Sequence, residues 1–315
     1  MWPICAMTGR PEVLIVAGPT ASGKSALALA LAQKLGGVII NADSMQVYRD
    51  LRILTARPSV ADEACAEHRL YGVIDAAERF SAGRWRELAV LAIRDAHAAG
   101  QVAIVTGGTG FYLEALSHGL SPIPDIPPDV SASAAACCEA MGASAFCAKL
   151  AAIDPESARR IGPSDRQRLV RAWSVWQATG RSLSDWHREP PPPPPFRTSQ
   201  VWLNPPRPVL YQRCDERLLH MLDHGALTEV ETLLDRRLNP ELPAMKALGM
   251  VELAAYLRGA LPLDQAIAAA QQATRRFAKR QLTWFRNRLP NALQIDAQFS
   301  ERIIDQIVSF IRKTG

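Results

Sequence analysis

A phosphate-binding motif lies near the start of the sequence. Residues 18–25 read Gly-Pro-Thr-Ala-Ser-Gly-Lys-Ser, which matches G-x-x-x-x-G-K-[ST] at every fixed position. Its glycines let successive backbone N–H groups point toward one anion, Lys24 adds a full positive charge, and the Ser25 hydroxyl can hold Mg²⁺. A di- or triphosphate is therefore expected to bind along the whole motif, at Gly18, Pro19, Thr20, Ala21, Ser22, Gly23, Lys24 and Ser25.

The acid that would act beside this phosphate is not in its usual place. An ATPase usually carries an acidic residue at the end of a later apolar strand, but here the apolar run Val102–Val105 leads into Thr-Gly-Gly-Thr-Gly. Asp43, which follows the run Val38–Ile40, is the nearest acid with a predicted strand before it. It could ligate Mg²⁺ or act as a general base. Asp43 and Ser44 could instead cap a turn or helix, and the local sequence leaves both interpretations open.

These residues are placed by an alternation of apolar runs and helical stretches over the first 120 residues. Strands are predicted at Val13–Ala17, Val38–Ile40 and Val102–Val105, and helices at Ser25–Leu35, Ser81–Ala99 and Gly110–Leu116. The alternation indicates an α/β fold with a mostly parallel sheet. Fully apolar strands fit that fold, because helices cover both faces of a parallel sheet. The phosphate motif falls between the first strand and the first helix, as its chemistry requires.

Two proline-rich segments, residues 121–129 and 190–208, divide the chain. Between them the sequence is rich in alanine and contains no convincing strand. Proline-rich segments are stiff and extended, which suits the connections of an inserted module. We therefore predict a helical insert at residues 122–199 within a catalytic core made of residues 1–121 and 200–315. The run Pro190–Pro195 could alternatively be a surface loop or a ligand for a proline-binding domain.

The C-terminal third is expected to add one strand to the sheet and then to form helices. A strand is predicted at Val201–Leu203, followed by helices at Arg207–Leu222, Leu227–Asp235, Met250–Leu257, Leu263–Arg288 and Ser300–Ile311. The predicted fold is thus a parallel sheet core like that of P-loop nucleoside-triphosphate hydrolases, with an inserted all-helical domain and a helical C-terminal region.

The amino-acid composition indicates a globular protein. Of the 315 residues, 48% are hydrophobic and 21% are charged, as in globular proteins rather than disordered or fibrous ones. No uncharged apolar run approaches the ~18 residues of a membrane helix, and residues 1–10 lack the basic start of a secretory leader. The six cysteines show no CxxC spacing. We therefore expect a reduced, cytoplasmic protein without membrane contact.

Charge is distributed unevenly. The net charge of +5 comes from 36 Lys and Arg against 31 Asp and Glu. Residues 275–288 contain no acid and hold Arg275, Arg276, Lys279, Arg280, Arg286 and Arg288, and a second basic cluster surrounds Arg168 in the predicted insert. Such patches indicate a polyanionic partner at particular surfaces, although two solvated helix faces would look the same in sequence.

Together these segments resemble the tRNA dimethylallyltransferase (tRNA isopentenyltransferase) family over nearly the whole chain. Asp-Ser-Met-Gln-Val-Tyr and Lys-Arg-Gln-x-Thr-Trp-x-Arg, in this order, are far more specific than a phosphate motif alone. The resemblance is carried by residues 18–25, 41–48, 55–58, 68–70, 80–83, 107–112, 165–172 and 279–287.

The resemblance implies transfer of the dimethylallyl group of dimethylallyl diphosphate to N6 of the adenosine 3′ of the anticodon, position 37, in tRNAs that read codons beginning with U. The phosphate motif would then hold the prenyl donor, with Mg²⁺ at Ser25, and no Walker-B acid would be needed. Asp43 matches the family's general base and Thr109 a threonine that contacts the target adenosine. An anticodon-loop base would have to be extruded to react.

The resemblance also implies which residues contact the tRNA anticodon stem-loop. They are Asp43, Ser44, Met45 and Gln46, Thr109, and on the insert Gln167, Arg168, Leu169, Val170 and Arg171. On the predicted C-terminal helix, Arg275, Arg276, Lys279, Arg280 and Arg286 interleave with Phe277, Trp284 and Phe285, whose chemistry suits an RNA loop. Trp173 and Trp176 are assigned to the insert core. A monomer is expected.

One segment departs from the family and three other functions stay open. Leu248-Gly249-Met250 stands where many members have Ile-Gly-Tyr, so no role of that tyrosine transfers. A small-molecule or nucleotide kinase would share the phosphate motif but would not need the basic helix. A transferase that acts on free adenine nucleotides would not need the insert. A non-catalytic RNA-binding module would leave the motif and Asp43 without a purpose.

Overall fold

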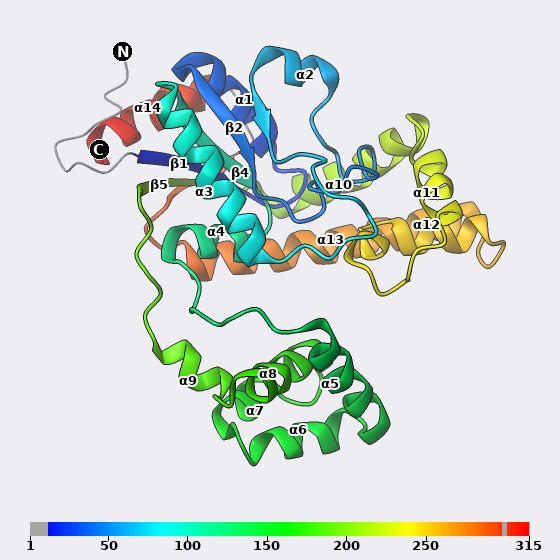
Figure 1. Ribbon diagram of the computed structural model, residues 1–315. Coiled ribbons are helices and arrows are strands. Elements are labelled where there is room, and N and C mark those ends of the chain that lie inside the picture. Colours follow the sequence, from blue (N-terminus) through cyan, green and yellow to red (C-terminus); the bar gives the residue numbers. More distant parts are fainter. Residues whose placement is uncertain (1–11, 298–300, 315) are drawn as a thin grey trace. The chain divides into compact units, whose positions relative to one another are not determined.

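The computed structural model describes residues 12–297 and 301–314, so the predictions for residues 1–10 and for Ser300 lie outside the described residues. Its contacts divide the chain into two units. One, the core unit, comprises Met1–Ser117 and Pro194–Gly315, and the other, the insert unit, is His118–Pro193. Figure 1 shows the insert unit as an all-helical body in green.

The core unit contains a six-stranded sheet in which every pairing is parallel. Its strands, in the spatial order β3-β2-β4-β1-β5-β6, are β1 (Glu12–Ala17), β2 (Gly37–Asn41), β3 (His68–Arg69), β4 (Val102–Gly107), β5 (Arg197–Leu203) and β6 (Leu293–Ile295). The α/β fold class and the four predicted strands are confirmed. β3 and β6 were not predicted, because two or three residues are too few to carry a hydrophobic pattern.

Both faces of the sheet are buried, which explains the unbroken apolar strands. Along β1, Val13 and Ile15 pack into one hydrophobic cluster, whereas Leu14 and Val16 pack into a second. This alternation follows from the two-residue period of a strand. The second cluster is completed by α1 (Lys24–Leu35) and α14 (Glu301–Thr314).

The first cluster is larger and lies under most of the other helices of the core unit. The helices that contribute to it are α3 (Ala82–Ala98), α4 (Gly110–His118), α10 (Arg207–Asp223), α11 (Ala226–Asp235), η1 (a 3₁₀ helix, Pro243–Lys246), α12 (Met250–Leu257) and the long α13 (Leu263–Arg288). The remaining helix of the unit is α2 (Val60–Cys65), which contributes no residue to the cluster. All the helices predicted in this unit are present. Short α2 was not predicted, and none of its residues is buried, so it has no apolar stripe to read.

The insert unit folds around its own small core. Its helices are α5 (Pro128–Met141), α6 (Ala143–Ala151), α7 (Pro155–Ile161), α8 (Arg166–Thr179) and α9 (Leu183–Arg188). Phe146, Leu150 and Trp173 are among the residues buried between them, and Trp176 packs partly against the same cluster. The unit ends at Pro193, short of the expected residue 199, because β5 already begins at Arg197.

No single helix among the described residues is long and apolar enough to cross a membrane; only α5 and α6 taken together pass that length and composition test, and they meet at a bend of 118°.

Candidate functional site

The phosphate motif forms a tight loop between β1 and α1. Ala21 has φ 62° and Gly23 has φ 91°, both in the left-handed region, so the chain turns sharply before the helix begins at Lys24. A Cβ on Gly18 would lie 2.6 Å from Ser22 Oγ, so a larger residue there would force the Ser22 side chain to move. The Ser22 hydroxyl is buried and has no hydrogen-bond partner among the described residues. A left-handed turn of this kind is the backbone geometry found in anion-binding loops.

Lys24 points into the space beyond this loop. Its Nζ donates to the carbonyl of Pro19 at 3.3 Å. Burial lowers the pKa of Lys24 to about 8, and the carboxylate of Asp43 partly opposes that shift. A bound anion would restore the full positive charge. Ser25, one residue further, is exposed and lines the same cavity.

Asp43 is held by a short hydrogen-bonded turn just after β2. Buried Asn41 accepts from the Asp43 backbone N–H at 2.8 Å, and its amide donates to the Asp43 carbonyl at 3.0 Å. Asp43 Oδ1 in turn accepts the N–H of Met45 at 2.9 Å. The turn-capping interpretation is therefore confirmed for one carboxylate oxygen, whereas Oδ2 has no hydrogen bond from any described residue and the role of Asp43 as a base stays a prediction.

Helix α10 closes the site with two cations that sequence reasoning missed. Arg213 and Arg217 lie one turn apart and both line the cavity. Arg217 donates a hydrogen bond to the Thr20 hydroxyl, and burial lowers the pKa of its guanidinium, with Asp43 acting in the opposite direction. The available signal was the four-residue spacing of two arginines on one predicted helix face.

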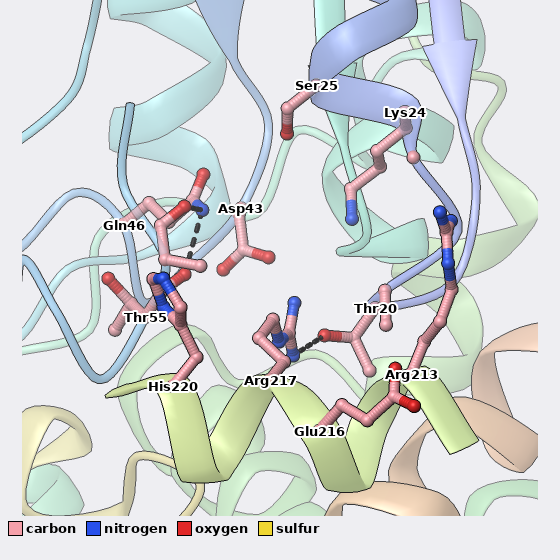
Figure 2. A pocket seen from close by; sticks show the side chains of 13 residues that line it. Thr20, Lys24, Ser25, Asp43, Gln46, Thr55, Arg213, Glu216, Arg217 and His220 are labelled. Atoms are coloured by element: carbon pink, nitrogen blue, oxygen red, sulfur yellow. Dashed lines mark hydrogen bonds between the residues drawn. The ribbon is translucent and has the colours of Figure 1, made fainter. Parts of the chain in front are cut away.

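Lys24, Asp43 and Arg217 point toward one another across a cavity of about 470 Å³ (Figure 2). This volume is typical of a site for a small organic ligand. The cavity is lined by Thr20, Ala21, Gly23, Lys24, Ser25, Asp43, Gln46, Thr55, Ala56, Arg213, Glu216, Arg217 and His220. Three cations, Lys24, Arg213 and Arg217, thus line a place where a diphosphate could bind, together with two carboxylates, Asp43 and Glu216.

The end of β4 has no room for a Walker-B acid. A Cβ on Gly107 would lie 2.1 Å from the Ala42 carbonyl oxygen, so any side chain there would collide with the backbone after β2. Thr109, two residues further, contacts the same segment, because its N–H donates to the Ala42 carbonyl at 3.2 Å. Of the two acids that line the cavity, Asp43 and Glu216, only Asp43 follows a strand of the sheet.

The predicted RNA-contact residues near Asp43 are largely occupied within the protein. Ser44 is hydrogen-bonded to Thr109, and Met45 is half-buried against the first cluster. The side-chain amide of Gln46 donates to the carbonyls of Thr55 and Ala56, both at 2.9 Å. Gln46 thus reaches the cavity while its amide holds the neighbouring loop.

Helix α13 sorts the predicted basic residues into two groups. Arg276, Lys279, Arg280 and Arg286 are exposed, whereas Arg275 pairs with Asp215 at 2.5 Å. Phe285 is a correction: its side chain is fully buried beside Trp202, so it belongs to the core and cannot meet an RNA loop. The helix period puts it on the opposite face from the exposed cations.

The insert unit places four of its five predicted contact residues at least partly at the surface. Gln167, Arg168 and Arg171 are exposed on α8, Arg168 pairs with Asp165 at 3.3 Å, and Val170 is half-buried. Leu169 is a second correction, because its side chain is fully buried in the core of the insert. The insert unit therefore has exposed arginines on α8, and the core unit has exposed arginines on α13.

Sequence comparison identifies related proteins. The model of the IPP transferase family matches residues 46–288. A tRNA dimethylallyltransferase of Rhodospirillum centenum is 55% identical over 294 residues, which cover 92% of this chain and 93% of that protein. A tRNA dimethylallyltransferase of Phenylobacterium zucineum is 53% identical over 281 residues, 89% of this chain and 91% of that protein.

Solved structures of similar shape agree with the sequence matches. A tRNA isopentenylpyrophosphate transferase from Bacillus halodurans superimposes with a TM-score of 0.70 at 32% identity, covering 96% of each chain. A eukaryotic dimethylallyltransferase acting on tRNA superimposes with a TM-score of 0.83 at 28% identity, covering 96% of this chain and 80% of the other.

Proposed function

The chain belongs to the IPP transferase family, and from this membership we propose that it is a tRNA dimethylallyltransferase that moves the dimethylallyl group of dimethylallyl diphosphate onto a tRNA adenosine. The acceptor atom is N6 of adenosine 37, in tRNAs that read codons beginning with U. The product is N6-dimethylallyladenosine.

One arrangement carries the proposal: Lys24 and Arg217 converge on a single cavity in which Asp43 keeps a carboxylate oxygen without a hydrogen bond from the described residues. The two cations stabilise the negative charge of a diphosphate, and more strongly as it becomes a leaving group. The free carboxylate oxygen can accept a proton from an amine in the same cavity.

The reaction is a single displacement. The N6 nitrogen attacks C1 of the dimethylallyl group, the bond from C1 to the diphosphate oxygen breaks, and pyrophosphate leaves with the bonding electron pair. Asp43 accepts the proton that N6 loses. Lys24, Arg217 and Thr20, which line the same cavity, hold the departing pyrophosphate.

The residues fit a magnesium ion that binds mainly through the diphosphate. Mg²⁺ takes oxygen ligands and keeps several waters, and the exposed Ser25 hydroxyl supplies one such oxygen at the cavity. The described residues contain no cluster of three or more His, Cys, Asp or Glu that could hold a metal alone. When bound, the ion would neutralise charge on the leaving group.

The exposed basic residues of both units support a tRNA partner. Exposed cations on α13 (Arg276, Lys279 and Arg280) and on α8 (Arg168 and Arg171) are suited to the phosphates of a tRNA anticodon stem-loop. We propose that the protein works as a monomer in the cytoplasm, where this tRNA substrate is found.

A kinase is the second candidate, because the phosphate loop would suit ATP. The collision between a Gly107 side chain and Ala42 argues against it, since the usual position of the magnesium-binding acid is blocked. The family match over residues 46–288 argues against it independently.

The test is incubation of the protein with labelled dimethylallyl diphosphate, Mg²⁺ and tRNA that lacks the modification. Label should enter tRNA at adenosine 37. ATP as donor and AMP as acceptor are run in parallel. Labelling of AMP alone would favour a free-nucleotide transferase, phosphate transfer from ATP would favour a kinase, and no transfer at all would overturn the proposal.

A further inference from the structure

A buried glutamine joins the two loops that flank the cavity. Gln281 of α13 is 6% exposed. Its side-chain oxygen accepts the backbone N–H of Thr20 at 2.8 Å, and its side-chain nitrogen donates to the carbonyl of Gly108 at 2.8 Å. One amide thus connects the phosphate loop to the loop after β4, across more than 170 residues of sequence in each case.

The packing around this amide leaves it little freedom. A Cβ on Gly108 would lie 2.3 Å from Gln281 Nε2, so the glycine lets the amide approach the backbone. Its neighbours Ala278, Leu282 and Phe285 on α13 are buried in the first cluster and hold the helix in register. The orientation of the amide follows from its partners, because Thr20 offers a donor and Gly108 an acceptor.

The loop after β4 continues directly to the acceptor side of the site. Thr109 follows Gly108, and its hydroxyl accepts the N–H of Ser44 at 2.9 Å. Ser44 follows Asp43. A chain of contacts therefore runs from the donor-binding Thr20 through Gln281 and Gly108 to the general base.

We propose that Gln281 is a positioning residue that sets the separation between the donor-binding loop and the acceptor-side loop. This inference rests on the proposed function, because it concerns the relative placement of the diphosphate and the attacking amine. A misplacement of about 1 Å between reacting groups can cost about a hundredfold in rate. Replacement of Gln281 should therefore lower the rate of the transfer step more than it weakens the binding of either substrate.

The chemistry of an amide makes the proposal testable by pH. Gln281→Glu keeps the size of the side chain, and its protonated form can still accept from Thr20 and donate to Gly108. The ionised form can only accept, and it would face the Gly108 carbonyl oxygen as a second acceptor. Burial raises the pKa of a carboxyl group, so the change falls within a range where the protein can be assayed.

The experiment measures single-turnover transfer to tRNA by Gln281→Glu, Gln281→Met and the parent between about pH 5.5 and about pH 8.5. The rate of Gln281→Glu relative to the parent should approach one at low pH and fall by about 10- to 100-fold at high pH. Gln281→Met should be slow at every pH. In both variants the KM values should stay within about threefold of the parent.

A matched control comes from the same helix. Gln272→Glu introduces the same charge at an exposed position of α13, and its rate relative to the parent should not change with pH. Thermal unfolding of every variant separates loss of fold from loss of rate, and recovery of Gln281→Glu at low pH shows that the fold persists.

The outcomes separate this inference from the function on which it rests. If the parent transfers no dimethylallyl group to tRNA, the proposed function fails. If the parent is active but Gln281→Met keeps its rate, or Gln281→Glu shows a pH-independent ratio, Gln281 does not position the loops. A rise in KM alone would assign Gln281 to substrate binding and would also overturn the proposal.

Discussion

Thr109 and Ser44, 65 positions apart in sequence, are joined by two hydrogen bonds: the Ser44 N–H donates to Thr109 Oγ1 at 2.9 Å, and that hydroxyl donates to Ser44 Oγ at 3.2 Å. The contact ties the loop after β4 to the segment that carries Asp43. The family resemblance assigns Thr109 to the target adenosine, and the structure adds a second role for the same hydroxyl inside the protein.

Thr109→Val removes that hydroxyl at nearly constant volume, so we expect the rate of transfer to fall by about 10- to 100-fold. Thr109→Ser keeps the hydroxyl and should stay within about threefold of the parent. Single-turnover transfer to tRNA measures both. Equal losses in the two variants would show that the methyl group matters rather than the hydrogen bonds.

Asp43→Asn should slow transfer strongly while leaving tRNA binding within a few-fold, because asparagine can still accept the N–H of Met45 but cannot take a proton. The expected loss is about 10²- to 10⁴-fold in rate. Transfer is measured by label in tRNA and binding by fluorescence anisotropy. A matched loss of binding and rate would make Asp43 a structural residue only.

Arg217→Gln should weaken the binding of pyrophosphate by about 10- to 100-fold, because it removes a half-buried cation that lines the cavity. Titration calorimetry with pyrophosphate measures the change. Arg207→Gln, at the exposed start of the same helix, is the control and should bind as the parent does. Unchanged affinity in Arg217→Gln would place the diphosphate elsewhere.

The pKa of Lys24 predicts how pyrophosphate binding depends on pH. Burial lowers the pKa of Lys24 from 10.5 to about 8 in the free protein, and a bound anion raises it. Below pH 8 the ammonium is already charged, whereas above pH 8 binding must take up a proton. Affinity should therefore fall above pH 8, by up to about tenfold per pH unit.

Lys24→Met supplies the reference, because pyrophosphate itself titrates equally in both experiments. The affinity ratio of parent to variant should be constant below pH 8 and should shrink above it. The free energy of unfolding depends on pH in the opposite direction. Between pH 8 and 10.5, without ligand, Lys24 is protonated in the unfolded chain but not in the folded protein. The contribution of Lys24 to the free energy of unfolding therefore rises with pH through that window. A constant ratio from pH 7 to 10 would contradict the pKa assignment.

Arg276→Gln combined with Arg280→Gln should weaken tRNA binding and make it less sensitive to salt, because both side chains are exposed on α13. If each contacts one phosphate, the slope of log affinity against log salt should change by about 1 to 2. Arg94→Gln with Arg258→Gln removes the same charge from other exposed positions and is the control. Equal slopes for the two double variants would mean that the α13 cations are merely solvated.

The local sequence pattern was enough to predict the main strands and helices of the core unit. The strand Val13–Ala17 and the helix after Lys24 could be read directly, because an unbroken apolar run and a glycine-rich turn are local signals. β3, with two residues, could not be read this way, and its pairing with β2 depends on tertiary contacts.

The amino-acid sequence by itself determined the phosphate loop, Asp43 as the candidate base, and the family, because each is written in residue types at short or fixed spacing. Only the tertiary structure decided what meets them. Arg217 and Gln281 reach Thr20 from positions 197 and 261 residues away, and Phe285 turns into the core while Arg276 faces outward. The reason is physical: contacts between distant segments depend on how helices pack on the sheet, and spacing along the chain does not record that packing.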